Sequence, residues 1–214
     1  MTTLENADLL KLTHWLSPVF PVGGYAYSHG LEHAIQTGDI ASAADLEAWL
    51  RVVLARGSGL ADAVLLARAQ AGEDCALLND WAAALAASSE RWQETREQGV
   101  AFTRSVNAVN SQDADPLALP VAVGRAAAGL SISATPVVAL YLQSFVANLV
   151  IGAVRHVPLG QEEGQRVIVA LQSTVLETAQ KAVDMKPKDV RGAAFGSDMA
   201  AMRHETQDVR IFRT

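Results

Sequence analysis

The sequence predicts an all-α fold, organised as a single-domain bundle of about eight to ten helices. Apolar residues recur with helical spacing in several segments, most clearly at Leu46, Trp49, Leu50, Val53 and Leu54. No segment shows a convincing alternation of apolar and polar residues between turn dipeptides, which a half-buried strand would need. The third observation is one long, almost entirely apolar segment near the middle of the chain.

That segment, residues 136–156, is expected to be a central buried helix. Its side chains are apolar or small on every face except at Gln143, Ser144 and Asn148, a pattern typical of a helix buried all round. Pro158 and Gly160 should end it. Its length of roughly 31 Å would fit a core helix or a membrane span. The three polar side chains and a mean hydropathy of only +0.16 favour the core.

The N-terminal part alternates helices with rigid turns. Residues 7–16 form an apolar helical face that ends at Ser17-Pro18. Two prolines and two glycines within the next eight residues exclude a regular helix and predict a turn. We expect a helix over residues 25–37, closed by Gly38, and then the amphipathic helix that contains Leu46, which begins near Ser42.

The middle and later parts predict further helices over 60–70, 77–85, 92–106, 120–129 and 161–183. Residues 111–120, SQDADPLALP, form the best loop. In the last long helix, the residues expected to face inward are Val167, Ile168, Leu171, Val175 and Leu176.

Charge divides the chain into a helical body, residues 1–184, and a tail, residues 185–214, of the same domain. The tail carries six basic and four acidic residues, whereas the body carries 11 basic and 19 acidic residues. The tail also mixes isolated apolar residues with charges, proline and glycine, so it should not bury itself. We expect a mobile tail that becomes ordered against a partner.

Composition excludes several functional classes. The net charge of −6 and the pI near 5.3 argue against nucleic-acid binding. The single cysteine, Cys75, permits no intrachain disulfide, and the N-terminus lacks a secretory pattern, so a cytoplasmic protein is expected. No glycine-rich phosphate loop is present, which argues against direct binding of GTP or ATP.

Two groups of polar or charged residues in the body each allow two interpretations. His29 and His33 lie four residues apart with Glu32 between them, which is the spacing of a two-ligand metal site, but a polar helix face or partner contact is the favoured interpretation. A charge run surrounds Trp92 and predicts either a solvated face or a partner-binding strip; it comprises Glu90, Arg91, Glu94, Arg96 and Glu97.

The tail has the composition of an interface. Arginine, methionine and aromatic residues are favoured at protein–protein interfaces, and an aromatic residue such as Phe212 gains nothing from exposure to water. We therefore expect partner binding through Arg203, His204, Glu205, Arg210, Ile211, Phe212 and Arg213.

Four stretches of the chain match the motifs of one known family. Ser17-Pro18, the segment PVGGYAYS over residues 21–28, and Gly30-Leu31-Glu32 resemble the N-terminal SPxxPxGxFSYSxGLE signature of the UreF family of urease accessory proteins. Residues 88–99 are similar, with looser spacing, to its S-x-E-x-R-E-x-x-x-G region. Residues 148–165, NLVIGAVRHVPLGQEEGQ, and residues 198–214, DMAAMRHETQDVRIFRT, are similar to its core stretch and its C-terminal ending. The departures, such as Ala26, Ala201, Val209, Ile211 and Thr214, remove no charged or aromatic position.

The resemblance implies an all-α, dimeric accessory protein without catalysis of its own. It would bind UreD (also called UreH), recruit the GTPase UreG to apo-urease, and support insertion of nickel into the dinickel centre. The arginine of the family's terminal R-L-F motif, which matters for recruiting UreG, matches Arg210. No cofactor would be tightly bound, although Ni²⁺ would pass through transiently. A second surface or dimer seam is expected at Tyr25, Tyr27, Ser28, Leu31 and Glu32.

Two enzymatic alternatives remain open at this point. The chain could act directly on UreG as a GTPase-activating or gating protein, which requires an exposed arginine near the nucleotide. It could also be a metal hydrolase that uses His29, Glu32 and His33, but the rest of a zinc-hydrolase motif is absent.

Overall fold

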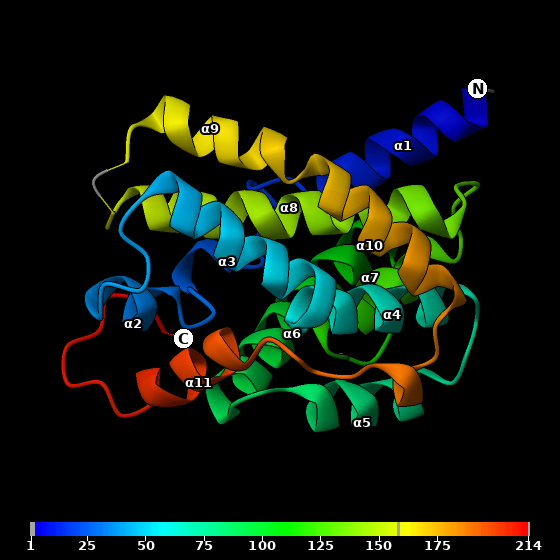
Figure 1. Cartoon of the computed structure of the whole chain (residues 1–214). Helices are drawn as coiled ribbons and strands as arrows, with labels where there is room; N and C mark the ends of the chain where they lie inside the picture. The colour runs from blue at the N-terminus through cyan, green and yellow to red at the C-terminus, as the bar shows by residue number, and fades with distance from the viewer. Residues whose placement is uncertain (1–2, 158, 214) are drawn as a thin grey trace.

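The all-α prediction is confirmed by the computed structural model, which describes residues 3–157 and 159–213 (Figure 1). Over these residues the chain forms eleven α-helices and two short 3₁₀ turns, η1 (Gly24–Ala26) and η2 (Pro187–Asp189). The helices are α1 (Thr3–Trp15), α2 (Leu31–Gln36), α3 (Ala43–Arg56), α4 (Ser58–Gln70), α5 (Cys75–Leu85), α6 (Ser89–Asn110), α7 (Leu119–Ala127), α8 (Ala134–Val154), α9 (Gln161–Ala170), α10 (Gln172–Asp184) and α11 (Phe195–His204). Pro158, the expected helix stop, and Thr214 lie outside the described residues.

Helix α8 is the predicted central helix, and it contacts α3, α4, α9 and α10. Its buried face carries Val138, Leu142, Val146 and Val150, all within the main hydrophobic core. The expectation that it is buried all round was wrong, because Ile151 and several neighbours on the other face are exposed or only half-buried. Among the described residues, α8 is the one helix long and apolar enough to cross a membrane; half of its apolar window is buried against the rest of the protein.

Two predicted helices differ from those in the structure. The helix expected over residues 25–37 is reduced to α2, because His29 and Gly30 have positive φ angles of 54° and 76°, which a right-handed helix excludes. The helix expected over residues 161–183 is divided at Leu171 into α9 and α10. This break changes the direction of the inward face, so Leu176 is 59% exposed while Val175 is buried.

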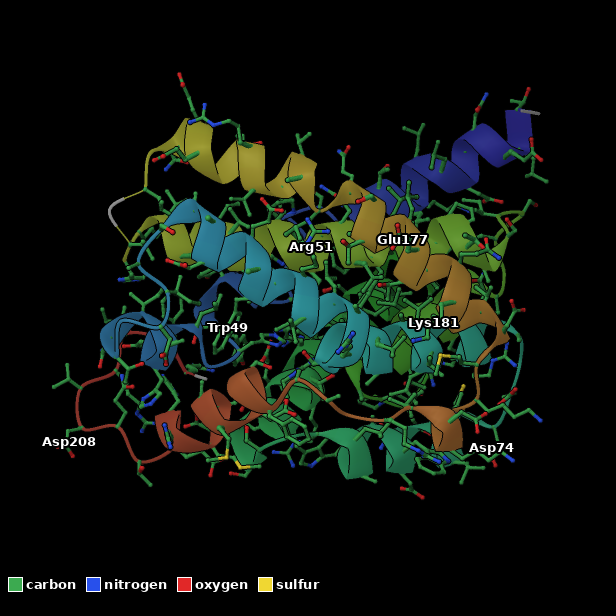
Figure 2. The ribbon with its side chains drawn as sticks, viewed as in Figure 1. Trp49, Arg51, Asp74, Glu177, Lys181 and Asp208 are labelled. Atoms are coloured by element: carbon green, nitrogen blue, oxygen red, sulfur yellow. The ribbon has the colours of Figure 1, made fainter. Side chains whose placement is uncertain are left out.

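Residues 185–213 pack against the body, so the expectation that the tail cannot bury itself was wrong. Val190, Ala194, Ala200, Ala201 and Phe212 are buried. Helix α11 contacts α2 and α6, and the chain after it passes along α2 (Figure 1). Trp49 of α3 points toward α11, and Asp208 lies at the outer edge of the loop that follows it (Figure 2).

Candidate functional site

The candidate site is the place where residues 204–213 meet α2 and α6. Helix α2 can approach α11 closely only because Gly30 has no side chain: a Cβ atom there would lie 2.5 Å from the backbone nitrogen of Ala201. The positive φ angle of Gly30 is likewise one that glycine adopts without strain. The same glycine therefore starts α2 and seats α11 beside it.

Glu32 binds the tail backbone from α2. Its Oε1 accepts a hydrogen bond from the Ile211 N–H at 2.8 Å, and its Oε2 accepts one from the Phe212 N–H at 2.8 Å. Burial acts to raise the pKa of Glu32, but the two amide bonds and His204 outweigh it, so the pKa is lowered. Glu32 is therefore ionised at neutral pH and acts as an anchor for the chain end.

His204, at the end of α11, lies between two carboxylates and is fully buried. Its Nδ1 is 2.8 Å from Glu90 Oε2, and its Nε2 is 3.2 Å from Glu32 Oε2. Each ring nitrogen of His204 thus faces a carboxylate oxygen, one from α2 and one from α6, and the ring links these two helices.

Two arginines of the tail pair with the acidic face of α6. Arg210 Nη1 lies 2.6 Å from Glu90 Oε1, and Arg213 Nη1 lies 3.1 Å from Glu97 Oε2. Glu97 also accepts a hydrogen bond from the Tyr27 hydroxyl at 2.7 Å. Burial and the bond to Glu97 raise the pKa of Tyr27 to about 12, so the phenol keeps its proton. The Arg210 and Arg213 side chains are 41% and 69% exposed, so both remain accessible at the surface.

Glu205 and Phe212 anchor the two ends of the segment that follows α11. The Phe212 ring packs on Gly152 of α8 and meets the His156 ring edge-on, with 5.0 Å between ring centroids. The Glu205 Oε1 accepts hydrogen bonds from the N–H and hydroxyl of Ser89, both at 2.7 Å. Ser89 is the first residue of α6, so Glu205 places a negative charge at the N-terminus of this helix, where the helix dipole stabilises it.

The structure merges the two surfaces that the sequence analysis treated as separate. Tyr27 and Glu32, expected in a second surface or dimer seam, contact the tail directly. Ser28 and Leu31 are buried within the chain, which removes them from a seam, and of this set only Tyr25 is exposed. Of the predicted tail residues, His204, Glu205, Arg210, Phe212 and Arg213 make the contacts described, as does the backbone of Ile211; the side chains of Ile211 and Arg203 are exposed.

Within the charge run on α6, Arg91 and Glu94 are buried, Glu90 and Glu97 are half-buried and Arg96 is exposed, so its interpretation as a solvated face was wrong except at Arg96. Arg91 lies 2.9 Å from Asp62 and 3.5 Å from Glu94, and all three side chains are at least nine-tenths buried. Burial raises the pKa of Asp62 against the opposing charge of Arg91. The missed signal was the spacing of Glu94 and Gln98 with Phe102, which places all three on the inward stripe of α6.

His29 and His33 do not form the two-ligand pair that their spacing allowed. His29 lies before α2, and its Nε2 is 2.7 Å from Glu94 Oε1, whereas His33 Nδ1 faces Gln207 Oε1 at 3.3 Å. Within residues 3–157 and 159–213, no group of three or more His, Cys, Asp or Glu side chains is placed to hold a metal ion.

A cavity of about 300 Å³ lies beside this site, between α1, α6 and α8. Aromatic side chains such as Trp15 and Phe145 line it, together with His29, Asp62 and Glu94. Burial and the neighbouring Asp62 raise the pKa of Tyr141, which donates a hydrogen bond to that carboxylate at 2.9 Å. The cavity thus combines apolar walls with a buried set of ionisable groups.

Comparisons with known proteins agree on one family. The UreF family model matches residues 40–172. The chain is 52% identical to the urease accessory protein UreF of Jannaschia sp. (strain CCS1) over 211 residues, which cover 98% of this chain and 96% of that protein. It is also 52% identical to UreF of Dinoroseobacter shibae, over 97% of this chain and 99% of the relative, and 45% identical to UreF of Paracoccus denitrificans over the full length of both.

Proposed function

The chain belongs to the UreF family of urease accessory proteins and acts in urease maturation, and we propose a specific role for it there. We propose that it is a non-catalytic adaptor. In this proposal it binds UreD, and through UreD it recruits UreG to apo-urease. The accessory-protein family favours a role without catalysis, and participation in the urease accessory complex follows from the family. The identity of each partner is part of the proposal.

The observation that carries the proposal is the arrangement of the tail. Phe212 and the backbone amides anchor the chain end, and the guanidinium groups of Arg210 and Arg213 remain at the surface. Partly exposed arginines held next to a rigid aromatic anchor are the kind of groups that dominate binding energy at interfaces. The tail therefore presents two partly exposed guanidinium groups, each paired with a carboxylate of α6, at the surface where a partner could bind.

Substitution of Arg210 tests the proposal better than truncation. Deletion of residues 200–214 would also remove His204 and leave the carboxylates of Glu32 and Glu90 without this partner. We predict instead that Arg210→Ala reduces formation of the complex with UreD and UreG by about tenfold or more, a typical loss for an interface arginine. Co-purification and the nickel content of urease would measure it.

The matched control is Arg166→Ala. Arg166 lies on α9 and its side chain is as exposed as that of Arg213. The pair that it forms with Glu162 is loose, because Arg166 Nη1 and Glu162 Oε2 are 3.9 Å apart. Its substitution should leave complex formation unchanged. Equal retention of UreD and UreG by both variants would contradict the role of the tail.

We propose that Ni²⁺ passes through the chain transiently and is not stored in it. The cavity beside the tail is lined by carboxylate and imidazole groups such as Glu94 and His29, and among the described residues no three such groups come together to hold a metal ion. Groups of this kind suit transient contact with a borderline divalent cation as cargo. Calorimetry of the isolated chain with Ni²⁺ should detect weak binding only, and a tight stoichiometric site would contradict this part of the proposal.

A second candidate function is direct regulation of GTP hydrolysis by UreG. The exposed guanidinium of Arg210 is the feature that favours it, because an arginine supplied by a partner can stabilise the charge of phosphoryl transfer. GTP turnover by UreG, measured with wild-type protein and with Arg210→Ala, separates this function from simple recruitment.

The proposal further includes a homodimer in the cytoplasm. Exposed apolar side chains outside the tail site, such as Val169 and Leu176, offer surface for self-association. Light scattering of the purified chain tests the dimer.

A further inference from the structure

The cavity of about 300 Å³ between α1, α6 and α8 has the size and the walls of a small-molecule site. Pockets that bind small molecules measure roughly 300–1,000 Å³ and combine mostly apolar walls with a few polar groups. Here the walls include the aromatic rings of Trp15, Phe102 and Phe145. In the part of the chain that the structure describes, no three His, Cys, Asp or Glu side chains converge on a bare metal ion, so these walls favour an organic molecule.

His29 brings an unused hydrogen-bonding atom to the lining of this cavity. Its side chain is only 9% exposed, and its Nε2 lies 2.7 Å from Glu94 Oε1. In a neutral imidazole, the nitrogen that faces a carboxylate carries the proton, and the other nitrogen is an acceptor. That other nitrogen, Nδ1, has no hydrogen-bond partner among the described residues. A buried acceptor without a donor costs free energy, so a donor on a ligand would stabilise this site.

Asp62 offers a second acceptor, from α4. Arg91 and Tyr141 both donate to its Oδ2, each at 2.9 Å, whereas its Oδ1 accepts no hydrogen bond from the residues that the structure describes. Burial raises the pKa of Asp62, so a further positive charge beside it would stabilise the ionised carboxylate. His29 is close enough to Asp62 for their charges to interact, so the two acceptors belong to one site.

The buried charges of the cavity leave an excess of negative charge. Asp62 and Glu94 contribute two carboxylates, and Arg91 is the one buried arginine among the described residues that line the cavity. Arg155, which also lines it, is exposed, so solvent screens its charge. The Phe145 ring lies next to the site, with its centroid 4.9 Å from that of the His29 ring, and an aromatic face attracts a cation.

We propose that this cavity binds a small organic cation, whose ammonium or amidinium group donates hydrogen bonds beside Asp62 and His29 while its apolar body packs against the aromatic walls. The inference goes beyond the proposed function, because it requires neither UreD nor UreG. It also differs from transient passage of Ni²⁺, because hydrogen bonds and aromatic contacts, and not coordination, recognise the ligand.

The first test uses benzylammonium as the probe and benzyl alcohol as a neutral molecule of similar shape. When benzylammonium is titrated into the full chain at neutral pH, the NMR signals of the Trp15 indole and the His29 ring should shift and saturate together. Benzyl alcohol should bind at least about tenfold more weakly, because hydrogen bonds between charged groups are stronger than those of a neutral hydroxyl. Equal affinity for the two probes, or no saturable binding of benzylammonium, would overturn the proposal.

Two substitutions test where the probe binds. Phe145→Leu removes an aromatic ring and keeps an apolar side chain, so it should weaken benzylammonium binding about two- to fivefold, the range of a cation–π contact. His29→Gln keeps a donor for Glu94 and removes the Nδ1 acceptor, so it should weaken binding about five- to tenfold. The matched controls are Trp81→Leu on α5 and His33→Gln on α2, which lie outside the cavity lining and should leave the affinity unchanged.

Circular dichroism of each variant first establishes that it is folded. His29 has a positive φ angle, which Gln adopts less readily than His, so Phe145→Leu carries the test if His29→Gln does not fold. Wild-type affinity for benzylammonium in the folded Phe145→Leu variant, or an equal loss of affinity in the two controls, would place the probe outside this cavity and refute the assignment.

Discussion

A single buried carboxylate, Glu32, joins α2 to the end of the chain. It accepts hydrogen bonds from two tail amides and faces the His204 ring, and its pKa is lowered despite its burial. Its partners thus stabilise the ionised form more than burial destabilises it. Binding of the tail to the body therefore depends on the ionisation of Glu32.

The lowered pKa gives a prediction with a definite sign. The folded chain keeps Glu32 ionised below the ordinary value of 4.5, at which the unfolded chain already takes up a proton. Its contribution to the free energy of unfolding is therefore complete above about pH 4.5 and is lost as the pH falls through the lowered pKa of the folded state. Glu32→Gln should lower the free energy of unfolding at pH 7 by about 1–3 kcal/mol, because buried donors lose their acceptor.

Urea unfolding at several pH values would measure this effect. The Glu32→Gln variant should show a smaller loss of stability between pH 5 and pH 3 than wild type does. Glu47→Gln on α3, where the carboxylate pairs with Arg51 far from the tail, should keep the wild-type pH dependence. A Glu32→Gln curve parallel to wild type over this range would contradict the role assigned to Glu32.

At the scale of elements, the contact between α2 and α11 depends on Gly30. The Gly30→Ala substitution introduces a Cβ atom 2.5 Å from the Ala201 backbone nitrogen and also places a side chain at a φ angle of +76°. We predict a loss of at least about 2 kcal/mol in the free energy of unfolding, from backbone strain and overpacking together.

Gly38 supplies the matched control for this prediction. It has a similar φ angle of +82°, but nothing lies within 4 Å of the position that a Cβ atom would occupy. Gly38→Ala should therefore cost only the backbone strain, about 1 kcal/mol. Equal losses in the two variants would show that close packing of α2 on α11 contributes nothing measurable.

At the scale of the whole molecule, the tail is packed as part of one domain. Removing residues 205–214, with His204 kept, leaves Glu32 and Glu97 without the backbone amides and the arginine that they bind. We predict that this shortened chain still folds, with a free energy of unfolding about 1–3 kcal/mol lower than that of the full chain. Superimposable denaturation curves would indicate a tail that adds no stability.

The prediction of the helices succeeded where a local pattern was sufficient. Ser42 caps α3, the apolar spacing that follows it lies in α3, and the long apolar segment is α8. The prediction failed where backbone geometry intervened, as at His29 and Gly30, because the periodicity of side chains carries no information on a positive φ angle.

The composition of the candidate site was predictable, but its assembly was not. The sequence alone determined an all-helical chain with a cationic, Phe212-bearing end and an acidic body, because helical periodicity and charge are written directly in the residue order. Only the tertiary structure decided that this end binds its own body at Glu32, Glu90 and Glu97, residues that lie more than 100 positions away in the chain. The physical reason is that burial of a charge depends on which distant residues surround it, and spacing along one helix cannot specify them.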